Sequence, residues 1–259
     1  MFRLIRTVSH YAATLLVITM AFFPASVLGQ SDAEQAFEAS GLESLFAKAP
    51  ETAFEIARQL GADDNVTSAW DASVRAHLSP DILTTALRLE FADRLDPASA
   101  DAVVKFRKSD LGRAITAAEA DVNLSFDEAS IEDTEALTED RLELYTKLSN
   151  LTAARDGGGQ FMGLVEALLA PLLPKADLDA AMTELASMVE GTSSLEANSD
   201  RVRLTFREFS DAELRAYIAH LESSDGQAFL DAKSISEDCV FRNAVAALAT
   251  DFASRIGGK

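Results

Sequence analysis

The sequence predicts an all-α protein of two pseudo-repeated multi-helix lobes that follow an N-terminal signal peptide. Helix-start signals recur along the chain, and apolar residues follow the helical period with almost no alternating strand pattern. One stretch of sequence also occurs twice, which indicates a supersecondary unit that is used twice. Hydrophobic residues make up 48% of the chain, so a core can form and disorder is not expected despite the acidic charge.

The N-terminal segment has the three parts of a secretory signal. Arg3 and Arg6 supply positive charge, and an apolar run follows over residues 12–23. Val27 and Gly29 suit the −3 and −1 positions of a signal peptidase, which predicts cleavage after Gly29 and a periplasmic or secreted protein. The apolar run is shorter than the roughly 20 residues of a membrane span, so an uncleaved anchor is the less favoured alternative. No integral membrane span is expected after cleavage.

A glycine-rich stretch divides the mature chain. Residues 156–160 read Asp-Gly-Gly-Gly-Gln and are predicted to form a linker. The predicted parts are the signal peptide (1–29), helical lobe 1 (30–155) and helical lobe 2 (156–259). A phosphate-binding loop is not predicted, because the residues before the glycines look helical and Phe161-Met162 follows them.

Several helix starts carry recognisable N-terminal signals. Three of them have a proline at or next to the first helical position, and these helices are expected over residues 51–60, 81–94 and 98–108. Ser79 and Asp96 are the expected N-caps of the second and third. Ser210 and Glu213 have the spacing of a capping box, which predicts a helix from there to residue 222.

Apolar periodicity predicts further helices, expected over residues 134–155, 161–170, 178–189 and 238–255. Residues 202–206 alternate between apolar and polar side chains, which is a strand pattern. A helix is still expected there, because no partner strand is visible and a lone strand cannot satisfy its own backbone groups.

The repeat places the segment from Leu95 over the segment from Phe209 without a gap. Ser109 then falls on Ser223 and can cap the helix that follows. In the first turn of that helix each copy has a glycine, and these are Gly112 and Gly226. Glycine in a helix costs about 1 kcal/mol relative to alanine, so its recurrence predicts close backbone approach by a neighbouring helix. Anion binding by exposed backbone N–H groups is the less favoured alternative.

The C-terminal copy resembles the signature of the bacterial domain-of-unknown-function 2059 family. The family pattern is F-[ST]-x-x-E-[LI], one helix, then S-x-x-G-x-x-[LF], and its counterparts here are Phe209, Ser210, Glu213, Leu214, Ser223, Gly226 and Phe229. The first copy matches weakly, and its structural residues are Leu95, Asp96, Pro97, Ser109 and Gly112. Arg107 there stands where Leu221 is apolar. The resemblance implies an exported helical protein and brings no activity, cofactor or catalytic residue.

No catalytic, cofactor-binding or metal site is predicted. His77 and His220 are the histidines of the mature chain, and they lack the spacing of metal ligands. His220 aligns with Phe106, which predicts a half-buried packing position. Cys239 has acidic neighbours that disfavour a thiolate, so a buried small hydrophobe is expected. Intermolecular pairing of this cysteine stays open.

The charge limits the classes of partner. The whole chain has a formal net charge of −19, and removal of Arg3 and Arg6 with the signal lowers it to −21. Such an acidic protein is not expected to bind nucleic acid or anionic lipid surfaces. The sequence therefore predicts a non-enzymatic envelope protein that binds a protein or an apolar ligand through a helical groove. Residues 161–170 and 178–189 could line that groove, but ordinary core packing is the favoured interpretation of their apolar spacing. The alternative is an unrecognised hydrolase with two carboxylates in one cleft.

Overall fold

The structure of the chain is a computed structural model, and it describes residues 31–125, 137–152, 157–191 and 194–257. The predicted signal peptide and its cleavage position at Gly29 lie outside these residues. The predicted boundary between the lobes, at residues 155 and 156, also lies outside them. Asp32–Lys259 form one compact unit.

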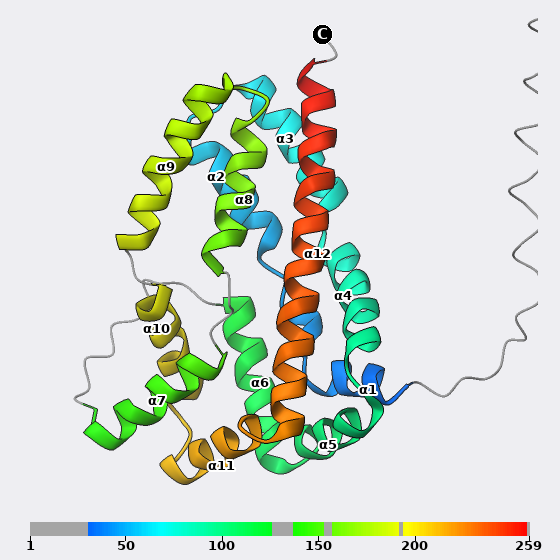
Figure 1. The fold of residues 1–259 in the computed structure, drawn as a ribbon, viewed down its shortest axis with the longest axis vertical. Helices are drawn as coiled ribbons and strands as arrows, with labels where there is room; N and C mark the ends of the chain where they lie inside the picture. The colour runs from blue at the N-terminus through cyan, green and yellow to red at the C-terminus, as the bar shows by residue number, and fades with distance from the viewer. Residues whose placement is uncertain (1–30, 126–136, 153–156, 192–193, 258–259) are drawn as a thin grey trace, which may run out of the picture. The chain divides into compact units, whose positions relative to one another are not determined.

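All regular secondary structure in the described residues is helical, so the all-α prediction is confirmed (Figure 1). The α-helices are α1 (Asp32–Ala39), α2 (Ala49–Gln59), α3 (Asp64–His77), α4 (Pro80–Arg94), α5 (Pro97–Arg107), α6 (Asp110–Ser125), α7 (Glu139–Thr152), α8 (Gly157–Leu169), α9 (Lys175–Gly191), α10 (Ser194–Phe206), α11 (Asp211–Leu221) and α12 (Ser224–Gly257). A short 3-10 helix, η1 (Leu42–Ser44), follows α1. In this part of the chain, no helix combines the length and the apolar character that crossing a membrane requires.

The predicted N-caps are present. The Ser79 hydroxyl accepts a hydrogen bond from the Ile82 amide at 3.4 Å, and the Asp96 carboxylate accepts one from the Ser99 amide at 3.0 Å. At the start of α11, Ser210 and Glu213 make both hydrogen bonds of the capping box. These side chains satisfy amide groups that have no partner within the helix, which is why the sequence marks these starts so clearly.

Two expected boundaries are wrong. Gly157–Gln160 form the first turn of α8, although the glycines predicted a linker. Residues 238–255 are not a separate helix, because α12 runs unbroken for 34 residues from Ser224 to Gly257. Helix α8 thus begins with glycines that each cost about 1 kcal/mol in a helix relative to alanine, and α12 packs against α3, α4, α5 and α8. The helix expected over 134–155 is observed as α7, and residues 134–136 and 153–155 lie outside the described part.

Helix α12 is the central element of the main core, where it packs against α3, α4, α5 and α8 (Figure 1). Its side chains Phe229, Phe241, Leu248 and Phe252 join a cluster with residues of α1 to α5 and α8. The Trp70 and Phe252 rings meet edge to face with centroids 5.2 Å apart. Side chains from both predicted lobes therefore build the same core.

A second hydrophobic cluster lies among α6, α7, α10 and α11. Its largest buried side chains include Tyr145, Leu148, Phe206 and Tyr217. Leu230 of α12 packs against both clusters and connects them.

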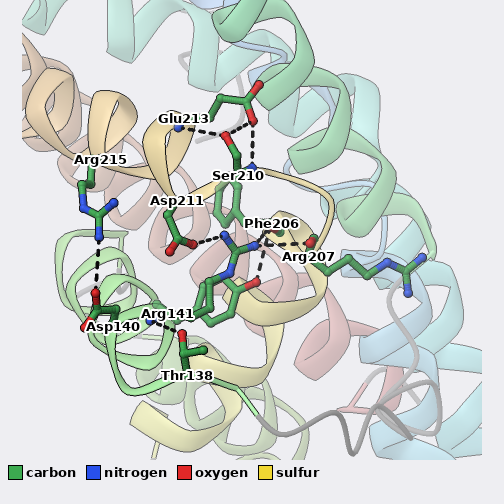
Figure 2. Close-up of polar contacts among 10 residues, drawn as sticks. Thr138, Asp140, Arg141, Phe206, Arg207, Ser210, Asp211, Glu213 and Arg215 are labelled. Atoms are coloured by element: carbon green, nitrogen blue, oxygen red, sulfur yellow. Dashed lines mark hydrogen bonds and ion pairs between the residues drawn. The ribbon is translucent and has the colours of Figure 1, made fainter.

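Arg141 fixes α7 against the turn between α10 and α11 (Figure 2). Its Nη1 donates to the Asp211 carboxylate at 2.8 Å, and its Nη2 donates to the carbonyls of Phe206 at 3.0 Å and Arg207 at 3.3 Å. The guanidinium also lies over the Tyr145 ring, 4.8 Å from its centroid. One side chain thus binds two carbonyl groups at the end of α10 and a carboxylate at the start of α11.

The turns α5–α6 and α11–α12 have the same geometry. The Ser109 hydroxyl accepts from the Gly112 amide at 3.0 Å, and the Ser223 hydroxyl accepts from the Gly226 amide at 3.1 Å. A Cβ atom on either glycine would lie 2.1 Å from a carbonyl oxygen near the end of the preceding helix. The expected close backbone approach is therefore present, and the end of the preceding helix makes it.

Candidate functional site

The residues of the predicted repeat motif lie in helix turns and helix contacts. They flank α5 (Leu95, Asp96, Pro97, Ser109, Gly112) and lie in or beside α11 (Phe209, Ser210, Glu213, Leu214, Ser223, Gly226). Their recorded contacts are helix caps, tight turns and core packing. The candidate site lies elsewhere.

A pocket of about 180 Å³ lies where η1 meets α5, α6, α7, α10, α11 and α12. Its apolar wall comes from Leu42, Leu45, Val202, Phe206, Phe229 and Leu230. Its charged residues are Arg107, Glu119, Arg201, Lys233 and Glu237. Helices α8 and α9 contain the segments considered for lining a groove, and none of their described side chains lines this pocket.

Arg107 is a buried cation in the pocket wall, with only 3% of its surface exposed. Its Nη1 donates to the Glu119 carboxylate at 2.8 Å and to the Thr116 hydroxyl at 3.3 Å. Its guanidinium lies 5.7 Å from the centroid of the Tyr217 ring and 5.4 Å from that of the Phe229 ring. Desolvation lowers the pKa of Arg107, but the interactions with Glu119 and Tyr217 together outweigh this effect and the net shift is upward. The side chain is therefore held as a cation.

Tyr217 completes this network. Its hydroxyl accepts from Arg107 Nη2 at 3.3 Å and donates to the other Glu119 oxygen at 2.6 Å. Burial raises the pKa of Tyr217, and the Glu119 carboxylate raises it further, so the hydroxyl stays protonated. Because one carboxylate accepts from both side chains, the buried charge of Arg107 is paired as a low-dielectric environment requires.

Arg201 is an exposed residue of α10 that also lines the pocket. Its Nη2 donates to the Asn123 amide oxygen, and the Asn123 amide nitrogen donates to the Ser44 hydroxyl at 3.0 Å. Ser44 in turn donates to the Gly41 carbonyl at 3.0 Å. This chain of hydrogen bonds connects α10, α6 and η1 and holds the guanidinium in place.

The charge of Arg201 has no ion-pair partner among the described residues. Surrounding protein shields the guanidinium from part of the solvent, and this desolvation lowers the pKa of Arg201. Glu237 and Glu119 oppose that shift through longer-range interactions. Lys233, the remaining cation of the pocket, pairs with Glu237 at 3.2 Å.

The two histidines of the described residues, His77 and His220, lie apart and outside the pocket. His220 stacks on Phe106, with centroids 3.7 Å apart and planes 10° from parallel, so the predicted half-buried packing position is confirmed. Burial, and then the charge of Arg107, lower the pKa of His220 to about 4. His77 ends α3, and its Nε2 lies 3.7 Å from an Asp251 carboxylate oxygen.

Cys239 was expected to be buried, but it is partly exposed on α12. The amide nitrogen of Asn243 lies 3.6 Å from its Sγ, one helical turn away. An exposed position is compatible with the helix because α12 buries only one stripe of residues there, through Val240 and Phe241. Within the described residues, no group of three or more His, Cys, Asp or Glu side chains could hold a metal ion.

The arrangement favours binding over acid–base chemistry. Among the described residues, the carboxyl groups with a displaced pKa are Asp96, Glu213 and Asp251, and hydrogen bonds lower the pKa of each. These three belong to helix caps and a surface ion pair and do not line the pocket. The two carboxylates that do line it, Glu119 and Glu237, are each paired with a cation.

Comparison of the chain with protein-family models, with curated proteins and with solved structures finds no match. The function is therefore argued from the pocket and its charges.

Proposed function

We propose that the mature chain is an exported, non-catalytic protein that binds a small ligand in the pocket around Arg107. The observation that carries this proposal is the pocket itself: about 180 Å³ of space, an apolar wall, and charged groups held by specific hydrogen bonds. Ligand sites in proteins have this composition, because apolar walls supply affinity and a few fixed polar groups supply orientation. A cavity of about 150 Å³ holds benzene, so this one suits a ligand of similar size with a polar substituent.

The proposal includes a duplicated unit, α1 to α6 followed by α7 to α12, which moves α7 from the predicted lobe 1 (30–155) into the second copy. The recurring serine–glycine turn supports it, as does the order of helix contacts. Helix α1 packs on α4 and α5, and α7 packs on α10 and α11. Helix α4 packs on α12, and α10 packs on α6, so each unit has a helix that packs against the other unit. The pocket then lies between the two units, and the C-terminal one carries the resemblance to the domain-of-unknown-function 2059 family.

Export is the second part of the proposal. It rests on the positive charge of Arg3 and Arg6, the apolar run over residues 12–23 and the small residues that end at Gly29. Mass spectrometry of the chain from its own envelope is expected to give a mass that begins at Gln30. A chain that keeps residues 1–29 and sediments with membranes would contradict cleavage.

A carboxylate-dependent hydrolase is the other candidate, because Glu119 and Glu237 line the same pocket. Such enzymes keep one carboxyl group protonated as a general acid while the other acts as base or nucleophile. Here Glu119 accepts from Arg107 and Tyr217, and Glu237 pairs with Lys233. Those contacts occupy both carboxylates with partners from the protein itself, so binding without catalysis is the better supported function.

The binding proposal is tested by filling the pocket. Leu45 is a partly buried residue of its wall, so Leu45→Trp should occupy the ligand's space. Leu60→Trp is the matched control, because Leu60 is 44% exposed and lies outside the pocket. Ligand-observed NMR with small acids, alcohols and amines of roughly six to ten heavy atoms is the measurement.

Wild type and Leu60→Trp are expected to bind members of this collection, and Leu45→Trp is expected to lose them. Circular dichroism checks that each variant is folded, and Leu230→Phe fills the pocket from α12 if Leu45→Trp does not fold. The proposal fails if no compound binds the wild type, or if a folded pocket-filling variant binds as the wild type does.

A further inference from the structure

We infer that the pocket takes a monocarboxylate with a compact apolar body, and that Arg201 binds the carboxylate. This inference rests on the proposed function and names the class of its ligand. It follows from the charges that line the pocket, from the way Arg201 is held, and from the size of the apolar space.

The charges leave one cation for the ligand. Arg107 pairs with Glu119 at 2.8 Å, and Lys233 pairs with Glu237 at 3.2 Å. Arg201 is the third cation of the pocket, and it has no direct carboxylate contact within the described residues. A ligand with one anionic group therefore matches the charges of the pocket. A second anionic group would lie in the partly shielded pocket without a cation to pair with it. A cationic ligand would be repelled by the unpaired guanidinium of Arg201.

The support of Arg201 fits the recognition of a carboxylate. Asn123 holds the guanidinium through its amide oxygen, and Ser44 fixes the Asn123 amide in turn. An amide positions the group without neutralising it, so the full charge stays available. A guanidinium presents five N–H donors in a planar fork that matches the two oxygens of a carboxylate, and Asn123 uses only one of them.

The apolar space limits the rest of the ligand. Leu42 and Leu45 line it from the N-terminal side of the chain, and Phe206, Phe229 and Leu230 line it from α10 and α12. About 180 Å³ accommodates one ring or a short branched chain, and a long acyl chain would not fit. Benzoate is therefore a suitable probe, with benzyl alcohol as its neutral analogue and phthalate as its dianion.

The test compares three variants of the mature chain with the wild type by isothermal titration calorimetry at low salt. Arg201→Gln removes the proposed carboxylate partner. Asn123→Asp keeps Arg201 but places a carboxylate against it in nearly the same shape. Arg203→Gln is the matched control, because Arg203 lies on the same helix, carries the same charge and pairs with Asp200 outside the pocket.

Wild type and Arg203→Gln are expected to bind benzoate equally and more tightly than either benzyl alcohol or phthalate. Arg201→Gln and Asn123→Asp are each expected to weaken benzoate binding about ten- to a hundredfold, the range of a charge-assisted contact. Binding of benzyl alcohol should change little in any variant. Thermal melts confirm that the variants are folded, and either of the two pocket variants suffices if the other is not.

Three results would overturn the inference. Benzoate binding that survives in a folded Arg201→Gln would remove the proposed partner, and tighter binding of benzyl alcohol or phthalate would change the ligand class. If wild type binds neutral compounds or amines but not benzoate, the inference fails while the proposed function stands. If no compound of any charge binds, the proposed function fails and the inference fails with it.

Discussion

Arg107 lies at the position that Leu221 holds in the second copy of the repeat. This single difference places a charged side chain in the wall of the pocket. Leu221 is fully buried among apolar side chains of the second cluster. Burial of a guanidinium in the same way would be destabilising by several kcal/mol without a partner. Glu119 and Tyr217 are these partners, because both form hydrogen bonds with Arg107 and with each other. The three side chains form a polar part of the pocket wall.

The glycines of the repeated turn give a prediction at the residue scale. Gly226→Ala should lower the free energy of unfolding by about 1–3 kcal/mol, because its Cβ would lie 2.1 Å from the His220 carbonyl oxygen. Gly112→Ala should behave alike, since its Cβ meets the Phe106 carbonyl at the same distance. Urea unfolding measures both.

Gly163→Ala is the control for these substitutions, because Gly163 lies inside α8 and its nearest neighbouring atom would be 3.9 Å from the new Cβ. There the better helix propensity of alanine should stabilise the protein by up to about 1 kcal/mol. Equal effects at all three glycines would contradict a steric reason.

His220 gives a prediction about pH. Its pKa is lowered from 6.5 in the unfolded chain to about 4 in the folded protein, so only the unfolded state takes up a proton between these values. Stability from this group is therefore complete above pH 6.5 and declines as the pH falls toward 4. Allowing for the partial exposure of His220, the loss between pH 7 and pH 5 should be about 1 kcal/mol.

His220→Phe places in the second copy the residue that the first copy has, and it should flatten this part of the stability profile. Unfolding free energies at pH 7, 6 and 5 give the comparison. An unchanged slope in His220→Phe would show that another group titrates.

The pocket could not be predicted from the sequence, for a reason visible at Arg107. Its partners lie 12 residues away at Glu119 and 110 residues away at Tyr217, and no periodicity connects them. The repeat did show a charged residue aligned with an apolar one, and that was the available signal. A cation at a packing position needs buried partners, so the alignment pointed to a polar network without identifying its members.

At the scale of helices, the sequence predicted where several helices begin but not how far they continue. Ser79, Asp96 and Ser210 each cap a backbone amide within three residues of sequence, so these N-caps could be predicted from the local sequence. The 34-residue length of α12 depends on packing against α3, α4, α5 and α8, which local reading does not contain. The start of α8, where three successive glycines are helical, was not predictable from local helix propensity either.

Arg141 gives a prediction for the docking of α7. Arg141→Lys should lower the free energy of unfolding by about 1–2 kcal/mol, because a lysine cannot reach the Asp211 carboxylate and two backbone carbonyls in one geometry (Figure 2). Hydrogen exchange should show faster opening of α7 in this variant.

Arg215→Lys is the matched control on the same surface (Figure 2). Arg215 and Asp140 are both largely exposed, and their charged atoms lie 3.9 Å apart. An exposed pair of this kind contributes little, so exchange in α7 and overall stability should not change. A comparable effect of both substitutions would mean that the Arg141 contacts hold α7 no better than the exposed Arg215–Asp140 pair does.

At the scale of the whole described unit, helices of each proposed copy pack against helices of the other copy, so the two copies do not form separate cores. Helix α12 covers α3, α4 and α5, and α10 covers α6. Neither set of six helices can bury its apolar surface without the other. The unit is therefore expected to unfold in one cooperative step, which distinguishes it from two lobes connected by a linker.

Trp70 makes this testable, because it is the one tryptophan of the sequence. It is fully buried, donates to the Ala53 carbonyl at 2.7 Å and meets Phe252 edge to face, so its fluorescence reports on the main core. Leu148→Ala removes a fully buried side chain of α7 in the second cluster and should cost about 2–5 kcal/mol. In a cooperative unit, this distant change lowers the urea midpoint of Trp70 fluorescence as much as that of the far-UV circular dichroism. In two independent lobes, the fluorescence midpoint would stay at its wild-type value while the circular dichroism transition splits in two.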